Sequence, residues 1–338
     1  MDFESEHPES VVHCENAKEF LEQINMYGGV WGDDPRHWIF RGHGDSTWKL
    51  LPSILRPTTI LHPYSAVNPL KPRPNPRNED QAYFYAMFEW DIVYDFMELT
   101  DWAQIPLPDD SPVFRTQGFK NDVVEKAIQH AIKGEYTWPP DDLLSIFALA
   151  QHYGVPTRLL DWSRYPLIAA HFAAVDSLKP RAERLAVWGL DRNALFQLSQ
   201  LSKGMMAKAI QIVESTPVKN IEILNKKLKL MSTQNVYRVG LVHIRAGTNP
   251  NLGAQKGIFT VDRNILVDTQ LEELLVQNEW NWDTSNPPLK KVTLLTSEAG
   301  KLLRLLSYQQ ITSAELLPGL SGVVKALEES RSWDKPRS

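Results

Sequence analysis

The sequence predicts an α+β fold with a mixed or antiparallel central sheet and helices around it. Three observations lead to this class. Short apolar and β-branched runs recur along the chain, helical patterns of very different length separate them, and the two do not alternate regularly. With 338 residues, of which 43% are hydrophobic and 23% charged, the chain can bury a substantial core.

Helical patterns dominate the first half of the chain. Asn16 suits the N-cap of the first helix, and Gly28 with Gly29 ends it, because Gly adopts the backbone conformation that closes helices. A short aromatic and β-branched run then predicts a strand that ends at Arg41. The Pro-rich stretch 57–78 predicts an extended loop. The expected helices cover residues 15–28, 79–100, 123–132, 142–150 and 166–174.

Short strands recur in the second half. Branched and apolar runs predict strands there, and longer runs between them predict helices. The expected strands cover residues 185–190, 239–244, 258–261 and 292–295, and the expected helices cover residues 194–230, 301–306 and 323–328.

Charge and cysteine content narrow the classes of function. A net charge of −5 argues against tight nonspecific binding of nucleic acid by the whole surface. The single cysteine, Cys14, cannot form an intramolecular disulfide, the first residues do not resemble a secretory signal, and no run is apolar enough to span a bilayer. We therefore expect a cytoplasmic protein without a membrane segment. No metal-binding motif stands in the chain, so no metal site is expected.

The run from Gln151 to Trp162 is the most informative stretch of the sequence. The helical pattern before it should end at Gly154, and Pro156 prevents the helix from continuing. We therefore expect its polar side chains on a short rigid connection between two apolar helices, where functional sites are often built. The candidate side chains are His152, Tyr153, Thr157, Arg158, Asp161 and Trp162, followed by Ser163.

Two interpretations of this run stay open. As ligand-binding groups, Arg158 and Arg41 could neutralise a pyrophosphate, His152 could exchange a proton near neutral pH, and the aromatic side chains offer faces for stacking. As a structural pair, Arg158 and Asp161 could meet across one helical turn, because they are three residues apart.

Arg41 is the second candidate. It stands in the motif Phe40-Arg41-Gly42-His43-Gly44, at the expected strand end and beside two glycines that would let a ligand approach the backbone. The planar guanidinium suits an anionic partner, since it pairs with two oxygens at once. The alternative is an arginine–carboxylate pair that holds the fold.

These stretches resemble the FRG domain family, which is named for its Phe-Arg-Gly motif. The resemblance covers about residues 36–325 and implies a domain of that extent with helical insertions, preceded by a helical lead-in over residues 1–35 and followed by a polar tail over residues 326–338. Besides the Phe-Arg-Gly motif, the similar segments are residues 48–56, 151–162, 255–260 and 311–322.

The order of these motifs is similar to that of ADP-ribosyltransferases of the arginine–serine–glutamate class. The resemblance implies an ADP-ribosyltransferase-like fold with NAD as substrate. It makes Arg41 the phosphate-binding arginine and Thr157 or Ser163 the pocket hydroxyl, with Gln255 where the class has its glutamate. Glutamine cannot act as a general base, so His152 or Asp161 would supply that function. The implied NAD-binding residues are Arg41, Gly42, Tyr153, Thr157, Arg158, Trp162 and Ser163.

The family context implies a toxin in bacterial anti-phage defence. Such an effector would modify RNA, DNA or protein and would have an antitoxin or chaperone partner. Local basic segments, Lys71–Arg77 and Lys226–Lys229, could line a groove for nucleic acid. Two other classes stay open: a metal-independent hydrolase or nuclease that uses His152 and Asp161, and a non-enzymatic nucleotide-sensing or docking module.

Overall fold

The computed structural model describes residues 3–32, 34–56, 79–116, 124–132, 138–178, 182–193, 195, 239–244, 250–263, 271–276 and 286–333. The expected Pro-rich loop with Lys71, Arg73 and Arg77 lies outside the described residues. The same holds for the Lys226–Lys229 segment and, apart from residue 195, for the helix expected over residues 194–230.

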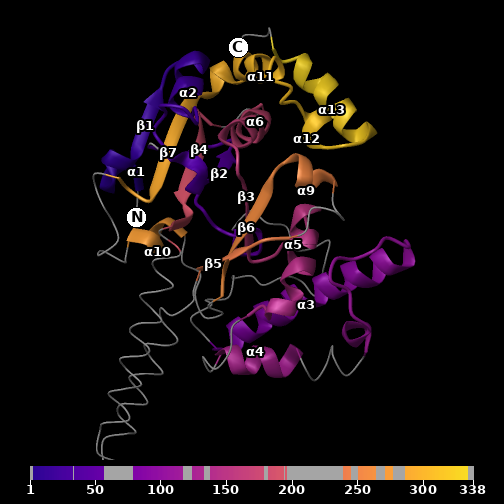
Figure 1. Cartoon of the computed structure of the whole chain (residues 1–338). Helices are drawn as coiled ribbons and strands as arrows, with labels where there is room; N and C mark the ends of the chain where they lie inside the picture. Colours follow the sequence, from indigo (N-terminus) through magenta and orange to yellow (C-terminus); the bar gives the residue numbers. More distant parts are fainter. Residues whose placement is uncertain are drawn as a thin grey trace, which may run out of the picture.

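A seven-stranded mixed sheet forms the centre of the protein, in the order β1-β7-β4-β2-β3-β6-β5 (Figure 1). Strands β1 and β7 pair in parallel, and the other neighbours pair antiparallel. The predicted α+β class with a mixed sheet is therefore confirmed. The strands are β1 (Val11–Cys14), β2 (Trp38–His43), β3 (Leu159–Ser163), β4 (Arg184–Asp191), β5 (Val239–Val242), β6 (Gly257–Asp262) and β7 (Leu289–Leu295).

Two of these strands were not expected from the sequence. Strand β1 lies in the segment predicted to be a helical lead-in, and it pairs with β7 at the edge of the sheet. Strand β3 occupies the stretch that was predicted to be a rigid connection, and it pairs with both β2 and β6. The prediction of a plain connection was wrong because pairing with two neighbouring strands stabilises this short strand, whose apolar pattern is interrupted by Asp161.

The described helices agree with the predicted ones in place, with shifted ends and four short additions near residues 3, 250, 271 and 313. None of the helices in the described ranges is long and apolar enough to cross a membrane. The helices are α1 (Phe3–Glu6), α2 (Ala17–Gln23), α3 (Glu79–Trp102), α4 (Val124–Ile132), α5 (Leu144–His152), α6 (Pro166–Ser177), α9 (Pro250–Ala254), α10 (Leu271–Val276), α11 (Ala299–Ser307), α12 (Ser313–Leu316) and α13 (Leu320–Ser330).

Local sequence accounts for several helix ends. The Asn16 side chain accepts hydrogen bonds from the backbone N–H groups of Lys18 and Glu19 and so caps α2, as predicted. Pro166 begins α6 at its first turn, and Gly154 follows α5 with a φ of +91°. Helix α13 runs to Ser330, and so enters the segment predicted to be a polar tail.

Two groups of helices cover the same face of the sheet. Phe40 of β2 pairs with Ser163 of β3, and Asp161 pairs with Phe259 of β6, so these side chains share one face. On this face α2, α6 and α11 pack over β7, β4 and β2, whereas α3, α4 and α5 pack over β3, β6 and β5 (Figure 1). A third cluster, which includes Phe3 and Trp188, covers the opposite face. The first face therefore has a seam between its two helical groups.

Candidate functional site

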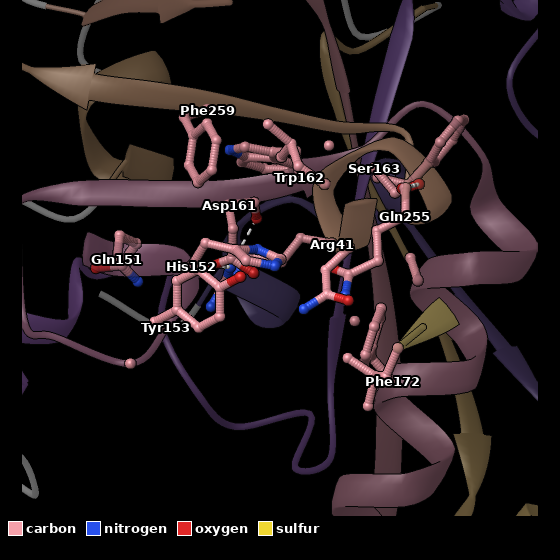
Figure 2. A pocket seen from close by; sticks show the side chains of 18 of the residues that line it. Arg41, Gln151, His152, Tyr153, Asp161, Trp162, Ser163, Phe172, Gln255 and Phe259 are labelled. Atoms are coloured by element: carbon pink, nitrogen blue, oxygen red, sulfur yellow. Dashed lines mark hydrogen bonds and ion pairs between the residues drawn. The ribbon is translucent and has the colours of Figure 1, made fainter. Parts of the chain in front are cut away.

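A pocket of about 540 Å³ opens at this seam (Figure 2). Its volume lies within the range of small-molecule sites, roughly 300–1,000 Å³. Strands β2, β3 and β6 form its floor, α5 and α6 stand on either side, and the segments 251–255 and 317–325 complete it. Of the candidate residues, Arg41, Gly42, His152, Tyr153, Asp161, Trp162, Ser163 and Gln255 line the pocket, and Thr157 and Arg158 do not.

Arg41 lies where β2 and β3 stop pairing. The two strands share the single register pair Phe40–Ser163, beyond which they diverge. Arg41 Nη1 crosses this gap and donates to the main-chain oxygen of Asp161 at 2.7 Å and to its Oδ1 at 2.6 Å. The strand continues to His43, so the prediction that Arg41 stands at a strand end was wrong. The Arg41 side chain thus provides the main-chain oxygen of Asp161 with a hydrogen bond where no backbone pairing joins β2 and β3.

His43 holds the same guanidinium from the other side. Arg41 Nε donates to His43 Nε2 at 3.0 Å. Burial of His43 and the charges of Arg41, Arg56 and Lys291 keep the pKa of this imidazole well below its ordinary value. His43 is therefore neutral, with Nε2 as acceptor and its proton on Nδ1. The sequence offered no signal for this role beyond the spacing of two residues, which places both side chains on one face of β2.

Asp161 is the ionised partner of this arginine. The Asp161 side chain is 57% exposed to the open pocket, yet the protein around it displaces enough water that desolvation alone would raise its pKa. The charge of Arg41 and its hydrogen bond outweigh that effect and lower the pKa to about 2. The pair therefore carries one positive and one negative charge at neutral pH. Arg41 was interpreted either as a ligand-binding group or as part of a structural arginine–carboxylate pair. The structure contains that pair, and both of its residues line the pocket.

Gly42 allows helix α6 to pack closely on β2, and it does not open the backbone to a ligand. A Cβ at this position would lie 2.0 Å from the carbonyl oxygen of Ala169 and 2.8 Å from the amide nitrogen of Ala173, both on α6. Helix α6 can therefore rest on β2 only because residue 42 has no side chain. The glycine thus brings the backbone of α6, and not a ligand, close to β2.

His152 and Tyr153 reach the pocket from the end of α5. Burial lowers the pKa of His152 below its ordinary value, although the charge of Asp161 opposes the shift, so the imidazole is neutral at pH 7. The Tyr153 side chain is 57% exposed, and its ring stands edge-on to His152 with centroids 5.4 Å apart. Figure 2 shows both side chains on the same side of the pocket as Asp161. A proton acceptor and an accessible aromatic face thus adjoin the ion pair.

Arg158 points away from the pocket. Its Nε and its backbone N–H donate to the two carboxylate oxygens of Glu89, each at 2.7 Å, and Trp138 Nε1 donates to the same carboxylate at 3.1 Å. Glu89 is fully buried on α3. The predicted pairing of Arg158 with Asp161 was therefore wrong, because each residue has another partner. Glu89 was not among the candidates, because a single acid within the expected helix 79–100 gives no local sign of a buried partner.

Of the two candidate pocket hydroxyls, Thr157 and Ser163, only Ser163 lines the pocket. Thr157 is buried, and its Oγ1 donates to Gln151 Oε1 at 2.9 Å. Ser163 lines the pocket and donates from Oγ to the main-chain oxygen of Gln255 at 2.8 Å. Ser163 is therefore the candidate hydroxyl that the structure places at the site.

Trp162 and Gln255 have fixed roles in the wall. Trp162 is 3% exposed and donates from Nε1 to Thr260 Oγ1 at 3.0 Å, so only part of its ring reaches the pocket. Gln255, between α9 and β6, donates from Nε2 to the main-chain oxygen of Leu316 at 3.1 Å. The side chain of Gln255 therefore ties the entry of β6 to helix α12.

A wall from the C-terminal helices was not predicted. Leu317, Ser321 and Lys325 line the pocket, as does Phe172 of α6. Ser321 and Lys325 are four residues apart on α13 and so lie on one face of that helix, which was a readable signal once the helix was known to face the site. Leu317 lies in the connection between α12 and α13.

The pocket thus combines two cations, a carboxylate, a neutral imidazole and aromatic surface. Among the described residues that line it, Asp161 is the carboxylate, and Arg41 and Lys325 are the cations. Within the described ranges no group of three or more His, Cys, Asp or Glu side chains could hold a metal ion. Such a lining can bind an anionic, partly aromatic small molecule and can accept a proton through His152.

Comparison with known proteins gives one match. Residues 109–182 match the family model described as the FRG domain. This range contains the run 151–162 and helix α6, and the motif around Arg41 lies outside it. No curated protein and no solved structure matches the chain.

Proposed function

This chain contains an FRG domain, and from that premise and the chemistry of its pocket we propose that it is an ADP-ribosyltransferase-like effector that uses NAD to modify a macromolecule. The acceptor is RNA, DNA or protein. The proposal includes a role as a toxin in bacterial anti-phage defence, with an antitoxin or chaperone as partner and the cytoplasm as its place of action.

In this proposal Arg41 and the aromatic residues bind the dinucleotide. The Arg41 guanidinium approaches the pyrophosphate, with Nη2 still available because its other nitrogens bind Asp161 and His43. Tyr153 and Phe172 offer faces to the nicotinamide or adenine ring. Ser163 supplies the hydroxyl beside the ring.

The transfer step uses Asp161 and His152. The bond between the ribose C1′ and the nicotinamide nitrogen breaks, and nicotinamide leaves with the electron pair. The ionised Asp161 stabilises the positive charge that develops on the ribose. The acceptor atom then bonds to C1′, and its proton passes to the neutral imidazole of His152. Asp161 thus supplies the carboxylate that the resembling enzymes supply through a glutamate at the position of Gln255.

One observation carries this proposal. Arg41, His152 and Asp161 come from separate elements, and all three line a single pocket large enough for a small molecule. The same observation favours a second candidate, a metal-independent hydrolase, in which His152 would activate water. The two candidates differ in whether NAD is consumed and whether ADP-ribose appears on an acceptor.

Labelled NAD separates these candidates. Purified protein is incubated with cell extract and NAD labelled in the adenylate, and label is measured in protein, RNA and DNA, with nicotinamide release measured in parallel. We expect label in one class of macromolecule and its loss in Arg41→Lys, because a single ammonium cannot bind Asp161 and His43 and also reach the pyrophosphate. Arg36→Lys is the matched control, since Arg36 is exposed and pairs with Asp34 away from the pocket. Folded protein that neither binds NAD nor releases nicotinamide would contradict the proposal.

A further inference from the structure

We infer that Lys325 of helix α13 gives this pocket its preference for anions and forms a second phosphate contact beside Arg41. The inference depends on the proposed function only for the identity of the ligand, because any phosphate-bearing molecule in the pocket would meet the same ammonium group.

The charges of the other lining residues cancel. Arg41 donates two hydrogen bonds to Asp161, one of them to the carboxylate, so these two residues form a neutral unit. His152 is neutral at pH 7, since burial lowers its pKa. Lys325 therefore supplies the remaining positive charge among the described lining residues. An arginine already bound to a carboxylate attracts a phosphate less strongly, because part of the interaction is with the carboxylate.

The ammonium of Lys325 is available. It has no hydrogen bond or ion pair to any residue in the described part of the chain. The acid four residues along, Glu329, is buried and turned inward, where it accepts from the backbone N–H of Ser313 at 3.2 Å and from the Ser313 hydroxyl. Lys325 is therefore not engaged by that acid, although the spacing would suit an ion pair on a free helix.

The helix that carries Lys325 is held in place by a contact of its own, and the short helix α12 before it is held by another. Glu329 also contacts His171 Nε2 of α6 at 3.3 Å, which joins α13 to the helix on the pocket wall. Gln255 Nε2 donates to the carbonyl of Leu316 at the end of α12. Because Ser321 and Lys325 share one face of α13, fixing this helix places Lys325 at the pocket (Figure 1 shows α12 and α13 beside α6 and α9).

The test measures binding of pyrophosphate, ADP-ribose and NAD by calorimetry at low ionic strength. It compares the wild type with Lys325→Ala, Lys325→Glu and Arg331→Ala. Arg331 is the matched control, because it is an exposed cation at the end of the same helix and does not line the pocket. We expect Lys325→Ala to weaken pyrophosphate and ADP-ribose about tenfold, Lys325→Glu to weaken them further, and Arg331→Ala to change little. Melting temperatures of all variants should match, since Lys325 makes no contact that folding needs.

Four outcomes separate this inference from the proposed function. Weaker binding of all three ligands in the Lys325 variants, with little change in Arg331→Ala, supports both. Pyrophosphate binding that depends on Lys325, without NAD binding, supports the inference and contradicts the proposed function. Equal affinity of wild type and Lys325→Ala for pyrophosphate and ADP-ribose, with NAD bound by both, overturns the inference and leaves the proposed function standing. Wild-type protein that binds none of the three anions overturns both.

Discussion

Arg41 donates from one nitrogen to both the main-chain oxygen and the carboxylate of Asp161, at the place where strands β2 and β3 separate. The contact is structural and chemical at once. It satisfies a backbone oxygen that has lost its strand partner, and it fixes the charge state of the carboxylate in the pocket.

The substitution Asp161→Asn should separate binding from chemistry. It removes the charge that Arg41 neutralises and keeps an oxygen as hydrogen-bond acceptor, so affinity for ADP-ribose should rise several-fold. Nicotinamide release should fall by a factor of at least about 100, because the developing positive charge loses its stabilising group. Calorimetry and a nicotinamide assay on the same preparation check this. Unchanged turnover would remove Asp161 from the proposed chemistry.

The same residue predicts a pH dependence of stability. The native pKa of Asp161 is about 2, below its ordinary value of 3.8. A carboxyl group with a lowered native pKa stabilises the fold fully above its ordinary pKa and loses this contribution as the pH falls through its native pKa. The stability difference between wild type and Asp161→Asn should therefore be constant from pH 7 to about pH 5 and should shrink toward pH 2. Urea unfolding at matched ionic strength measures it.

Arg158→Met should destabilise the protein strongly without changing the pocket. It leaves the fully buried Glu89 without its charged partner, and breaking a buried pair in this way costs about 3–5 kcal/mol. The double variant Arg158→Met with Glu89→Gln should recover part of the loss, because no buried charge remains. Denaturant unfolding gives the free energies, and ligand affinity of the folded fraction should equal that of wild type. A loss of ligand affinity in the stable double variant would mean that Arg158 does contribute to ligand binding.

Gly42→Ala should destabilise the protein, because Gly42 of the Phe-Arg-Gly motif is needed for the packing of α6 on β2. The added Cβ would meet the backbone of α6 at 2.0 Å, so the helix must shift, and we expect a loss of about 1–3 kcal/mol in stability. Gly240→Ala is the control in another strand, because its Cβ would lie 3.6 Å from its nearest neighbours. If both variants unfold at the same temperature, the packing argument fails.

Gln255→Glu should weaken the C-terminal wall rather than simply add a catalytic carboxylate. The amide nitrogen that donates to Leu316 is replaced by an oxygen, which faces the carbonyl oxygen without a shared proton. We expect a lower melting temperature than for Gln255→Ala, which loses the hydrogen bond but adds no repulsion. Equal melting temperatures would mean that the contact to Leu316 contributes nothing.

Local patterns explain which elements were predictable. Strands β4, β6 and β7 were found because each is a buried apolar run, and α5 and α6 because Gly154 and Pro166 mark their ends. Strand β3 was missed because its exposed Asp161 interrupts the apolar pattern. Local spacing could not predict the partners of Arg41 and Arg158, which lie 120 and 69 residues away along the chain. The candidate residues near the pocket were therefore largely found, whereas their pairing had to come from the structure.

The place of β3 in the sheet determines when the site can form. The range that matches the FRG domain includes β3, but both of its neighbours, β2 and β6, lie outside that range. Expressed alone, residues 109–182 would present a strand with two open edges, which favours aggregation over folding. In the full chain the pocket also needs Glu329, which secures α13. During synthesis on a ribosome, the pocket can therefore be completed only after residue 329 has emerged, long after Arg41.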